Sequence, residues 1–261
     1  MSEHSALNTI LRPGGITPLF QPIIRITEER RSLHALECLS RGPAGTNFAS
    51  AGVLFDYVRL KREESLVDRA CIIAALAQAK ALPADVHLCI NVHASTLGRD
   101  VAFVPFLVAA AEKQDVKMSR LTVEVVEHAP PWDNRSFLDA IEQLRVLGAK
   151  LAVDDVGLGQ SNFKMLIDVS PDYLKLDRYF VAACSRDAKR RAVVAAVTQL
   201  AREFGGEVIA EGIEDPADLE VLRTFGITLL QGYLFAHPMP AADVAKLDLW
   251  SAVGDSHRFQ T

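Results

Sequence analysis

Two neighbouring carboxylates, Asp154 and Asp155, end an apolar run in the stretch "LAVDDVGLGQSN" (151–162), and glycines follow them. Adjacent acids repel each other unless a cation or hydrogen-bond donors lie beside them. Such a stretch could be a phosphate loop, a metal site or a tight turn. The phosphate-loop interpretation is weak, because Asn162 stands where G-x-G-x-x-G requires its last glycine and no G-x-x-x-x-G-K-[ST] motif occurs.

Other polar residues lie late in apolar runs, as these two acids do. They are Glu37, Asn91, Glu124, Lys175, Glu211 and Gln231. An isolated buried charge costs several kcal/mol or changes its protonation state, so a set of buried carboxylates needs cations beside it. Lys175 alone cannot neutralise five acids. Carboxylates and one Asn carbonyl form an all-oxygen ligand set, which suits Mg²⁺ or Mn²⁺, and no His or Cys cluster has zinc spacing.

Each of these residues also has an ordinary structural explanation when it is taken alone. Glu37 could be a surface acid on an edge strand, and Asn91 could be a turn residue. Glu124 and Glu127 are three positions apart, so a regular strand directs them to opposite faces. One of them can therefore be a ligand, and the other is expected to support a neighbouring loop. His93 is predicted to lie exposed in a loop.

The elements that must position these residues alternate along the chain. Apolar, β-rich runs lie at 19–26, 33–40, 87–92, 121–127, 150–155, 173–176, 207–211 and 227–232. Helical patterns lie at 50–63, 65–81, 95–113, 136–147, 187–204 and 215–224. Eight strands with intervening helices predict an α/β fold, a (β/α)8 barrel of the TIM type, whose chemistry gathers at the carboxyl ends of the strands. An open doubly wound sheet is the second possibility.

One connection departs from this alternation. The first two strands are joined by "TEERRS" (27–32), which is too short for the crossover that parallel neighbours require. We therefore predict one antiparallel strand near the N-terminus of the barrel. Residues 1–14 are predicted to form a flexible N-terminus, 15–250 a single domain and 251–261 a C-terminal tail.

Composition narrows the class of protein. The chain has 261 residues, of which 49% are hydrophobic, and a formal net charge of -5. We find no apolar run long enough to span a membrane, no secretory signal and no basic cluster that would bind nucleic acid. A cytoplasmic protein with no DNA and no membrane partner is predicted. The four cysteines have no C-x-x-C spacing and are predicted to be buried and reduced.

The order of the motifs resembles that of the EAL-domain family of cyclic di-GMP phosphodiesterases, from about Leu19 to Pro240. "FQPII" (20–24), "ECLSR" (37–41), "INVHAS" (90–95), "VEVVE" (123–127), "DDVGLGQSN" (154–162), "DYLKLDRYFV" (172–181), "IAEGIE" (209–214) and "QGYLFAHPMP" (231–240) follow one another as the family's motifs do. The signature reads E-C-L in place of E-A-L. Each piece is weak alone, and the series in the correct order is specific.

The resemblance implies roles for the residues that match. Two divalent ions, Mg²⁺ or Mn²⁺, would be held by Glu37, Asn91, Glu124, Asp154, Asp155 and Glu211. Lys175 would contact the attacking water, Gln231 would order the lysine and water, and Glu127 would anchor the glycine-containing loop. Gln21, Leu39 and Arg41 would hold the dinucleotide, and Asp177 and Glu214 match positions near the substrate. The implied reaction converts cyclic di-GMP into linear pGpG.

The sequence departs from the family most in the loop after the two acids. Val156, Leu158 and Gln160 replace Phe, Thr and Tyr there, and Val126 replaces Thr between the two glutamates. In the family this loop joins the metal site to the dimer interface, so a homodimer is implied and the altered residues bear on the turnover rate. Two alternatives to an active enzyme are a cyclic di-GMP receptor with little or no catalysis and an interaction module that acts through its outer helices while the site is vestigial. A regulatory protein partner is predicted as a source of regulation.

Overall fold

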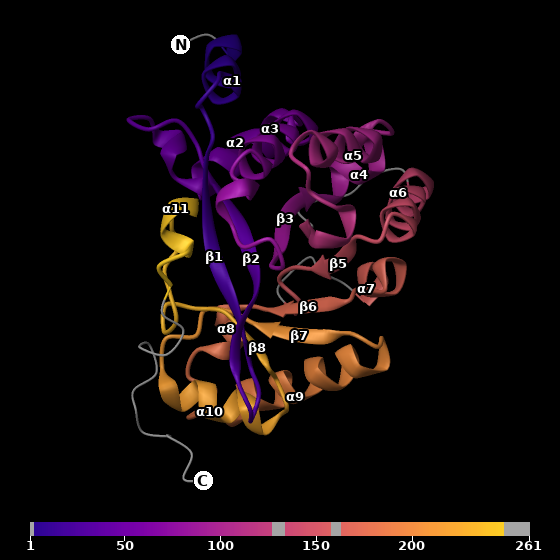
Figure 1. Ribbon diagram of the computed structural model, residues 1–261. Coiled ribbons are helices and arrows are strands. Elements are labelled where there is room, and N and C mark those ends of the chain that lie inside the picture. Colours follow the sequence, from indigo (N-terminus) through magenta and orange to yellow (C-terminus); the bar gives the residue numbers. More distant parts are fainter. Residues whose placement is uncertain (1–2, 127–133, 158–162, 248–261) are drawn as a thin grey trace.

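The computed structural model describes residues 3–126, 134–157 and 163–247. Eight strands form a closed barrel in sequence order, and helices surround it (Figure 1). The fold class and the strand count predicted from the sequence are therefore confirmed. The strands are β1 (Thr17–Ile26), β2 (Arg31–Arg41), β3 (His87–His93), β4 (Leu121–Val126), β5 (Lys150–Val153), β6 (Tyr173–Leu176), β7 (Glu207–Ala210) and β8 (Leu229–Leu230).

Strand β1 is the predicted antiparallel strand. It pairs antiparallel with β2 and with β8, whereas β2 to β8 are paired parallel. The register places Thr17 opposite Arg41 and Gln21 opposite Glu37. The first half of β1 therefore lies at the same end of the barrel as the carboxyl ends of the other strands, and Gln21 is brought beside the predicted metal ligands.

The helices follow the predicted pattern with local differences. They are α1 (Glu3–Leu11), α2 (Ala51–Lys61), α3 (Glu64–Leu76), α4 (Ala94–Arg99), α5 (Phe103–Lys113), α6 (Asn134–Val146), α7 (Phe163–Val169), α8 (Arg178–Val181), α9 (Ala188–Glu203), α10 (Pro216–Thr224) and α11 (Ala241–Val244). The single helix predicted over 95–113 is divided into α4 and α5, because Asp100 leaves helical geometry and its side chain accepts a hydrogen bond from the Ala102 amide at 3.1 Å.

The N-terminal segment also differs from the expectation of a flexible stretch. Residues 3–11 form α1, and Ile10 is fully buried in a cluster with Leu54 and Val58 of α2. Burial removes these apolar side chains from water, which stabilises the packing of the helix against the rest of the domain. The predicted tail, 251–261, lies outside the described residues.

The apolar core has two layers. A small cluster fills the inside of the barrel, and a large one lies between the strands and the surrounding helices. Tyr173 of β6 is the largest member of the inner cluster, and Lys175 stands two residues further along the same strand. Alternation along a strand directs both side chains inward. The inner apolar cluster therefore packs directly beneath the polar residues at the carboxyl ends of the strands.

At the amino ends of the strands, His34 and His87 pack against this inner cluster. His34 Nε2 lies 3.2 Å from the Tyr173 hydroxyl, and its ring stacks on His87 at a centroid separation of 5.8 Å. Burial first, and then the charge of Arg25, lowers the pKa of His34 to about 4. Glu207, which forms a hydrogen-bonded ion pair with Arg25 at 2.7 Å, opposes this shift.

We expect the substitution His34→Gln to weaken the acid sensitivity of the fold. Between about pH 6.5 and about pH 4 the unfolded chain takes up a proton at His34 and the folded chain does not, so the free energy of unfolding falls as pH falls. The effect is on the order of 1 kcal/mol, because the ring is partly exposed. Thermal unfolding of both proteins at about pH 7 and about pH 4.5 measures it, and equal falls in Tm would contradict this assignment.

Candidate active site

The predicted polar residues meet at one end of the barrel, around the ammonium group of Lys175. This side chain is 2% exposed, and its Nζ lies 2.6 Å from Glu211 Oε1, 3.4 Å from Asp154 Oδ1 and 3.5 Å from Glu37 Oε1. Glu124 Oε1, which is fully buried, forms a close ion pair with the same nitrogen. Four carboxylates from four separate strand ends therefore share one buried cation.

The charge of this cluster is unbalanced, since four carboxylates face one ammonium group. Burial raises the pKa of Glu124 and that of Glu211 well above the usual range, and the attraction of Lys175 offsets only part of this effect. Burial alone would lower the pKa of Lys175, but Asp154, Glu124 and the other acids raise it well above its ordinary value. Lys175 is therefore a cation, and the site attracts further positive charge.

Two amide side chains hold Glu37 in place. Asn91 Nδ2 donates to Glu37 Oε1 at 3.3 Å, and Gln231 Nε2 donates to Glu37 Oε2 at 2.6 Å. The parallel register of β3 and β4 sets Asn91 beside Glu124. Asn91, Glu37 and Gln231 lie far apart in the sequence, and the structure brings all three to the acid cluster.

Asp155, the residue after Asp154, has an unusual backbone conformation. Its φ of 52° is in the left-handed region, so the chain leaves strand geometry at Asp155 itself, before Gly157. The Val156 amide then donates to the Lys175 carbonyl at 3.2 Å, which ties the start of the loop to β6. Burial first, and then the neighbouring Asp154 and Asp177, raises the pKa of Asp155 to about 6. The backbone therefore changes direction between Asp154, which follows β5 directly, and Asp155, which has the left-handed conformation.

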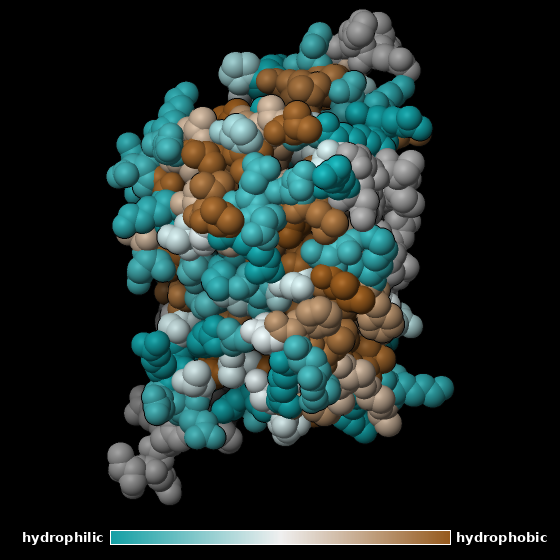
Figure 2. All heavy atoms as spheres, turned by 90° about the vertical axis from the view of Figure 1, so that its right-hand side faces the viewer, coloured by the Kyte–Doolittle hydropathy of each residue, from teal (hydrophilic) through white to brown (hydrophobic). Residues whose placement is uncertain are grey.

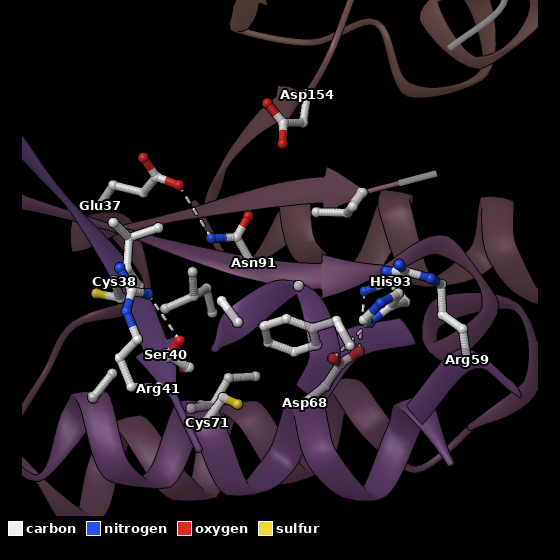
Figure 3. Close-up of a pocket in the computed structure, with 18 residues that line it drawn as sticks. Glu37, Cys38, Ser40, Arg41, Arg59, Asp68, Cys71, Asn91, His93 and Asp154 are labelled. Atoms are coloured by element: carbon white, nitrogen blue, oxygen red, sulfur yellow. Dashed lines mark hydrogen bonds and ion pairs between the residues drawn. The ribbon is translucent and has the colours of Figure 1, made fainter. Parts of the chain in front are cut away.

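Two cavities open on either side of Glu37 and Asp154, which line both. One has a volume of about 230 Å³ and is lined by the polar residues Gln21, Lys175, Glu211 and Gln231 among others. The other has a volume of about 340 Å³ and extends between β2 and the helices α2 and α3. Figure 3 shows this larger cavity with Arg41 on one side, Arg59 and His93 on the other, and Glu37, Asn91 and Asp154 along one edge.

The residues predicted to contact substrate are divided between the two cavities. Leu39 and Arg41 line the larger one, and Asp177 and Glu214 line the smaller one together with Gln21. Asp177 also caps α8 by accepting a hydrogen bond from the Tyr179 amide at 2.6 Å, and Glu214 pairs with Arg178 at 3.1 Å. Glu127, Leu158 and Gln160 lie outside the described residues.

His93 is not the exposed loop residue that the sequence predicted. It is 7% exposed, its Nδ1 lies 2.8 Å from Asp68 Oδ1, and its backbone amide donates to Asp68 Oδ2 at 3.0 Å. Burial lowers the pKa of His93, but the charge and the hydrogen bond of Asp68, together with the charge of Glu64, outweigh it, so the pKa is raised. The correction arises because Asp68 of α3, itself buried, provides a partner that compensates for burying the ring.

Asp68 is a residue of the site that sequence reasoning missed. Besides His93 it accepts a hydrogen bond from Thr96 Oγ1 at 2.6 Å, so it fixes the turn that follows Asn91. A signal was present in the sequence. Asp68 stands at the i position of an apolar helical stripe that continues at Cys71, Ile72 and Ala75, where an apolar residue is expected.

The predicted buried state of the cysteines is confirmed.

The donor set fits hard divalent cations in its chemistry. All the candidate ligands are oxygen atoms, and Glu124 Oε2 is buried without a hydrogen-bond partner. In this structure the acids surround the ammonium group of Lys175. Within the described ranges, no three His, Cys, Asp or Glu side chains are arranged so that they could hold a metal ion. A bound cation would therefore draw carboxylate oxygens away from Lys175.

The chain is similar in sequence to known proteins that contain an EAL domain. The model of the EAL domain matches residues 4–238. Cyclic di-GMP phosphodiesterase NbdA of Pseudomonas aeruginosa is 29% identical over 251 residues, which are 93% of this chain and 31% of the relative. The chain thus spans less than half the length of the curated relatives it matches.

Solved structures share the fold. A standalone EAL protein from Vibrio cholerae O395, bound to c-di-GMP, has a TM-score of 0.77 and 26% identity, with 87% of this chain and 93% of that chain covered. BlrP1 of Klebsiella pneumoniae, in its manganese and cyclic di-GMP complex, has a TM-score of 0.73 and 28% identity, with 88% of this chain and 57% of that chain covered.

Proposed function

Since the chain belongs to the EAL domain family, we propose that it hydrolyses one 3′–5′ phosphodiester bond of cyclic di-GMP and releases linear pGpG, with divalent metal as cofactor. The observation that carries the proposal is the buried Lys175 among four carboxylates at the carboxyl ends of the strands. A domain that only bound nucleotide would gain nothing from burying so many acids, because an acidic pocket repels an anionic substrate.

The residues that would hold the metal are those of the acid cluster and its Asn neighbour. Glu37, Asn91, Glu124 and Asp154 would take one Mg²⁺ or Mn²⁺, and Asp154, Asp155 and Glu211 a second. When bound, the ions would offset the repulsion between the pocket and the phosphate, activate water and stabilise the charge that develops at phosphorus. A solved structure of BlrP1, a related protein, is a complex with manganese and cyclic di-GMP, which supports a divalent metal as the cofactor.

The chain's own side chains would supply the rest. Lys175 would donate a hydrogen bond to the attacking water, since its ammonium group stays charged. Gln231 would keep Glu37 oriented through its 2.6 Å hydrogen bond. Arg41, which lines the larger cavity, would pair with a phosphate, and its guanidinium is already held by a hydrogen bond to the Ser40 carbonyl at 3.0 Å.

We expect the purified chain to convert cyclic di-GMP into pGpG in the presence of Mg²⁺ or Mn²⁺. Product formation should stop when EDTA removes the metal and return when excess metal is added, because the acids alone repel the substrate. Chromatography of the nucleotides measures both steps. Tight binding of cyclic di-GMP with no pGpG under either metal would instead support a receptor.

The receptor is the second function to weigh, and one feature favours it. Val156 stands where the family has Phe, and it is 4% exposed, so it belongs to the core rather than to the surface of the loop. A smaller buried residue at this point changes the packing behind Asp154 and Asp155, and positioning errors of about 1 Å can lower turnover markedly. The metal titration described above separates the two functions.

We further propose that the chain forms a homodimer and acts in the cytoplasm with a regulatory protein partner. Phe163 and Ile167, one helical turn apart on α7, are 73% and 67% exposed, which is unusual for large apolar side chains. The face that carries α5 to α7 shows apolar surface between polar groups (Figure 2).

In the described part of the chain, none of the helices is long and apolar enough to cross a bilayer.

A further inference from the structure

Two aromatic rings stack on each other beside the smaller cavity, and one of them, Tyr233, lines it. Tyr233 and His237 have ring centroids 4.0 Å apart and an interplanar angle of 30°. Both side chains are exposed, and 51% of Tyr233 is open to solvent. The pair therefore packs on itself and leaves an aromatic face open to solvent, which is an arrangement that the apolar core does not require.

The backbone beneath Tyr233 is rigid. Ile213 N donates to the Gln231 carbonyl at 3.0 Å, and Leu234 N donates to the Ile213 carbonyl at 2.9 Å, so the loops after β7 and β8 are hydrogen-bonded on both sides of the tyrosine. Gly232 permits this approach, because a Cβ there would lie 2.1 Å from the Ile213 carbonyl oxygen. The backbone that carries the ring is held by these hydrogen bonds, which lowers the entropy cost of binding a flat ligand.

The position of the pair links it to the chemistry. Tyr233 lines the same cavity as Lys175, Glu211 and Gln231, and Gln231 is two residues before it. Gln21 Nε2 donates to the Ala236 carbonyl at 3.3 Å, so the turn between the two rings is also fixed to β1. A phosphodiester held at Glu37 and Asp154 would place one nucleoside in each of the two cavities that these acids separate.

We propose that Tyr233, backed by His237, is a stacking platform for one purine base of the substrate. This inference rests on the proposed function and adds a positioning residue to it. Nucleobases stack on aromatic side chains with useful affinity, and every base has a π-face to offer. The acidic rim makes the platform necessary, since a dianionic ligand gains little from electrostatic attraction on this side of the pocket before metal binds. The base is then fixed through its uncharged face.

The test compares cyclic di-GMP hydrolysis by the wild type, Tyr233→Ala, Tyr233→Phe and His237→Ala. Tyr233→Ala should raise KM about 10-fold, the size expected for one lost base stack, while kcat changes less. Tyr233→Phe keeps the ring and should behave as the wild type. His237→Ala should give a smaller rise. Tyr179→Ala is the matched control, because Tyr179 is 60% exposed and does not line the cavity.

Competition by small ligands gives a second readout. GMP should inhibit the wild type more strongly than ribose 5-phosphate does, and Tyr233→Ala should remove that difference. If Tyr233→Ala unfolds, Tyr233→Leu keeps apolar bulk without an aromatic face and must show the same rise in KM. A wild-type KM in Tyr233→Ala or Tyr233→Leu overturns the platform. A wild type that binds cyclic di-GMP without hydrolysing it overturns only the proposed reaction, and the same variants then measure the platform through Kd.

Discussion

Replacing Lys175 by methionine is expected to lower kcat for cyclic di-GMP hydrolysis by about 10²–10⁴-fold. The substitution removes the buried ammonium group that faces four carboxylates and keeps most of the side-chain volume. The attacking water would lose its positively charged donor, while the metal ligands would remain. Rates of pGpG release at saturating substrate and metal measure the effect, and a variant with a near-normal kcat would show that Lys175 does not contact the reacting water.

The same substitution should also make folding dependent on metal. Without Lys175 the acids are left without their buried cation, and breaking a buried ion pair costs about 3–5 kcal/mol. We therefore expect a lower Tm in EDTA than in Mg²⁺ or Mn²⁺, by a margin larger than that of the wild type. Lys150→Met is the matched control, because Lys150 pairs with Asp172 at 2.7 Å with its side chain 47% exposed, and such pairs contribute about 0–1 kcal/mol.

Replacing Glu37 by alanine is expected to abolish detectable turnover, a loss of at least about 10²-fold, and to raise the metal concentration needed for any residual activity by about 10-fold or more. The change removes a proposed ligand and leaves the amide groups of Asn91 and Gln231 without their acceptor. Both amides would then be free to rotate away from the positions they hold. Activity titrated with Mn²⁺ at fixed substrate measures both effects.

A second carboxylate provides the control for Glu37. Glu207 lies at the opposite end of the barrel, where it accepts hydrogen bonds from Arg25 at 2.7 and 2.9 Å. The Glu207→Ala variant should keep the metal dependence of the wild type and lose only some stability. Equal metal titration curves for Glu37→Ala and wild type would rule out the proposed ligand role.

Much of the fold and the gathering of the site could be predicted from the sequence. The period-2 and helical patterns indicate alternating elements, and a short polar connection is enough to predict the antiparallel strand. Polar residues late in apolar runs, such as Glu124 and Lys175, meet because the carboxyl ends of parallel strands lie at one end of a barrel. These inferences depend on local pattern and on topology, which a sequence records directly.

The remaining features depend on contacts between distant elements. Nothing near His93 in the sequence indicates that Asp68, on another element, will bury and hold it. The turn at Asp155 begins before the glycines, because the aspartate itself adopts a left-handed conformation, which short polar side chains tolerate better than most. The exposed stack of Tyr233 on His237 likewise depends on how the chain turns after β8.

The pairing of β1 with β8 has a consequence for folding. Glu37 and Gln231 are hydrogen-bonded although they are 194 residues apart in the sequence, and β1 closes the barrel against its last strand, β8. Contacts of such high sequence separation form late, after the loop-closure entropy of the whole chain has been overcome. A chain still emerging from the ribosome would carry Glu37, Asn91 and Glu124 long before Gln231 joins them. The pocket is therefore completed only when synthesis of the barrel is complete, and shortened chains that lack β8 should be inactive.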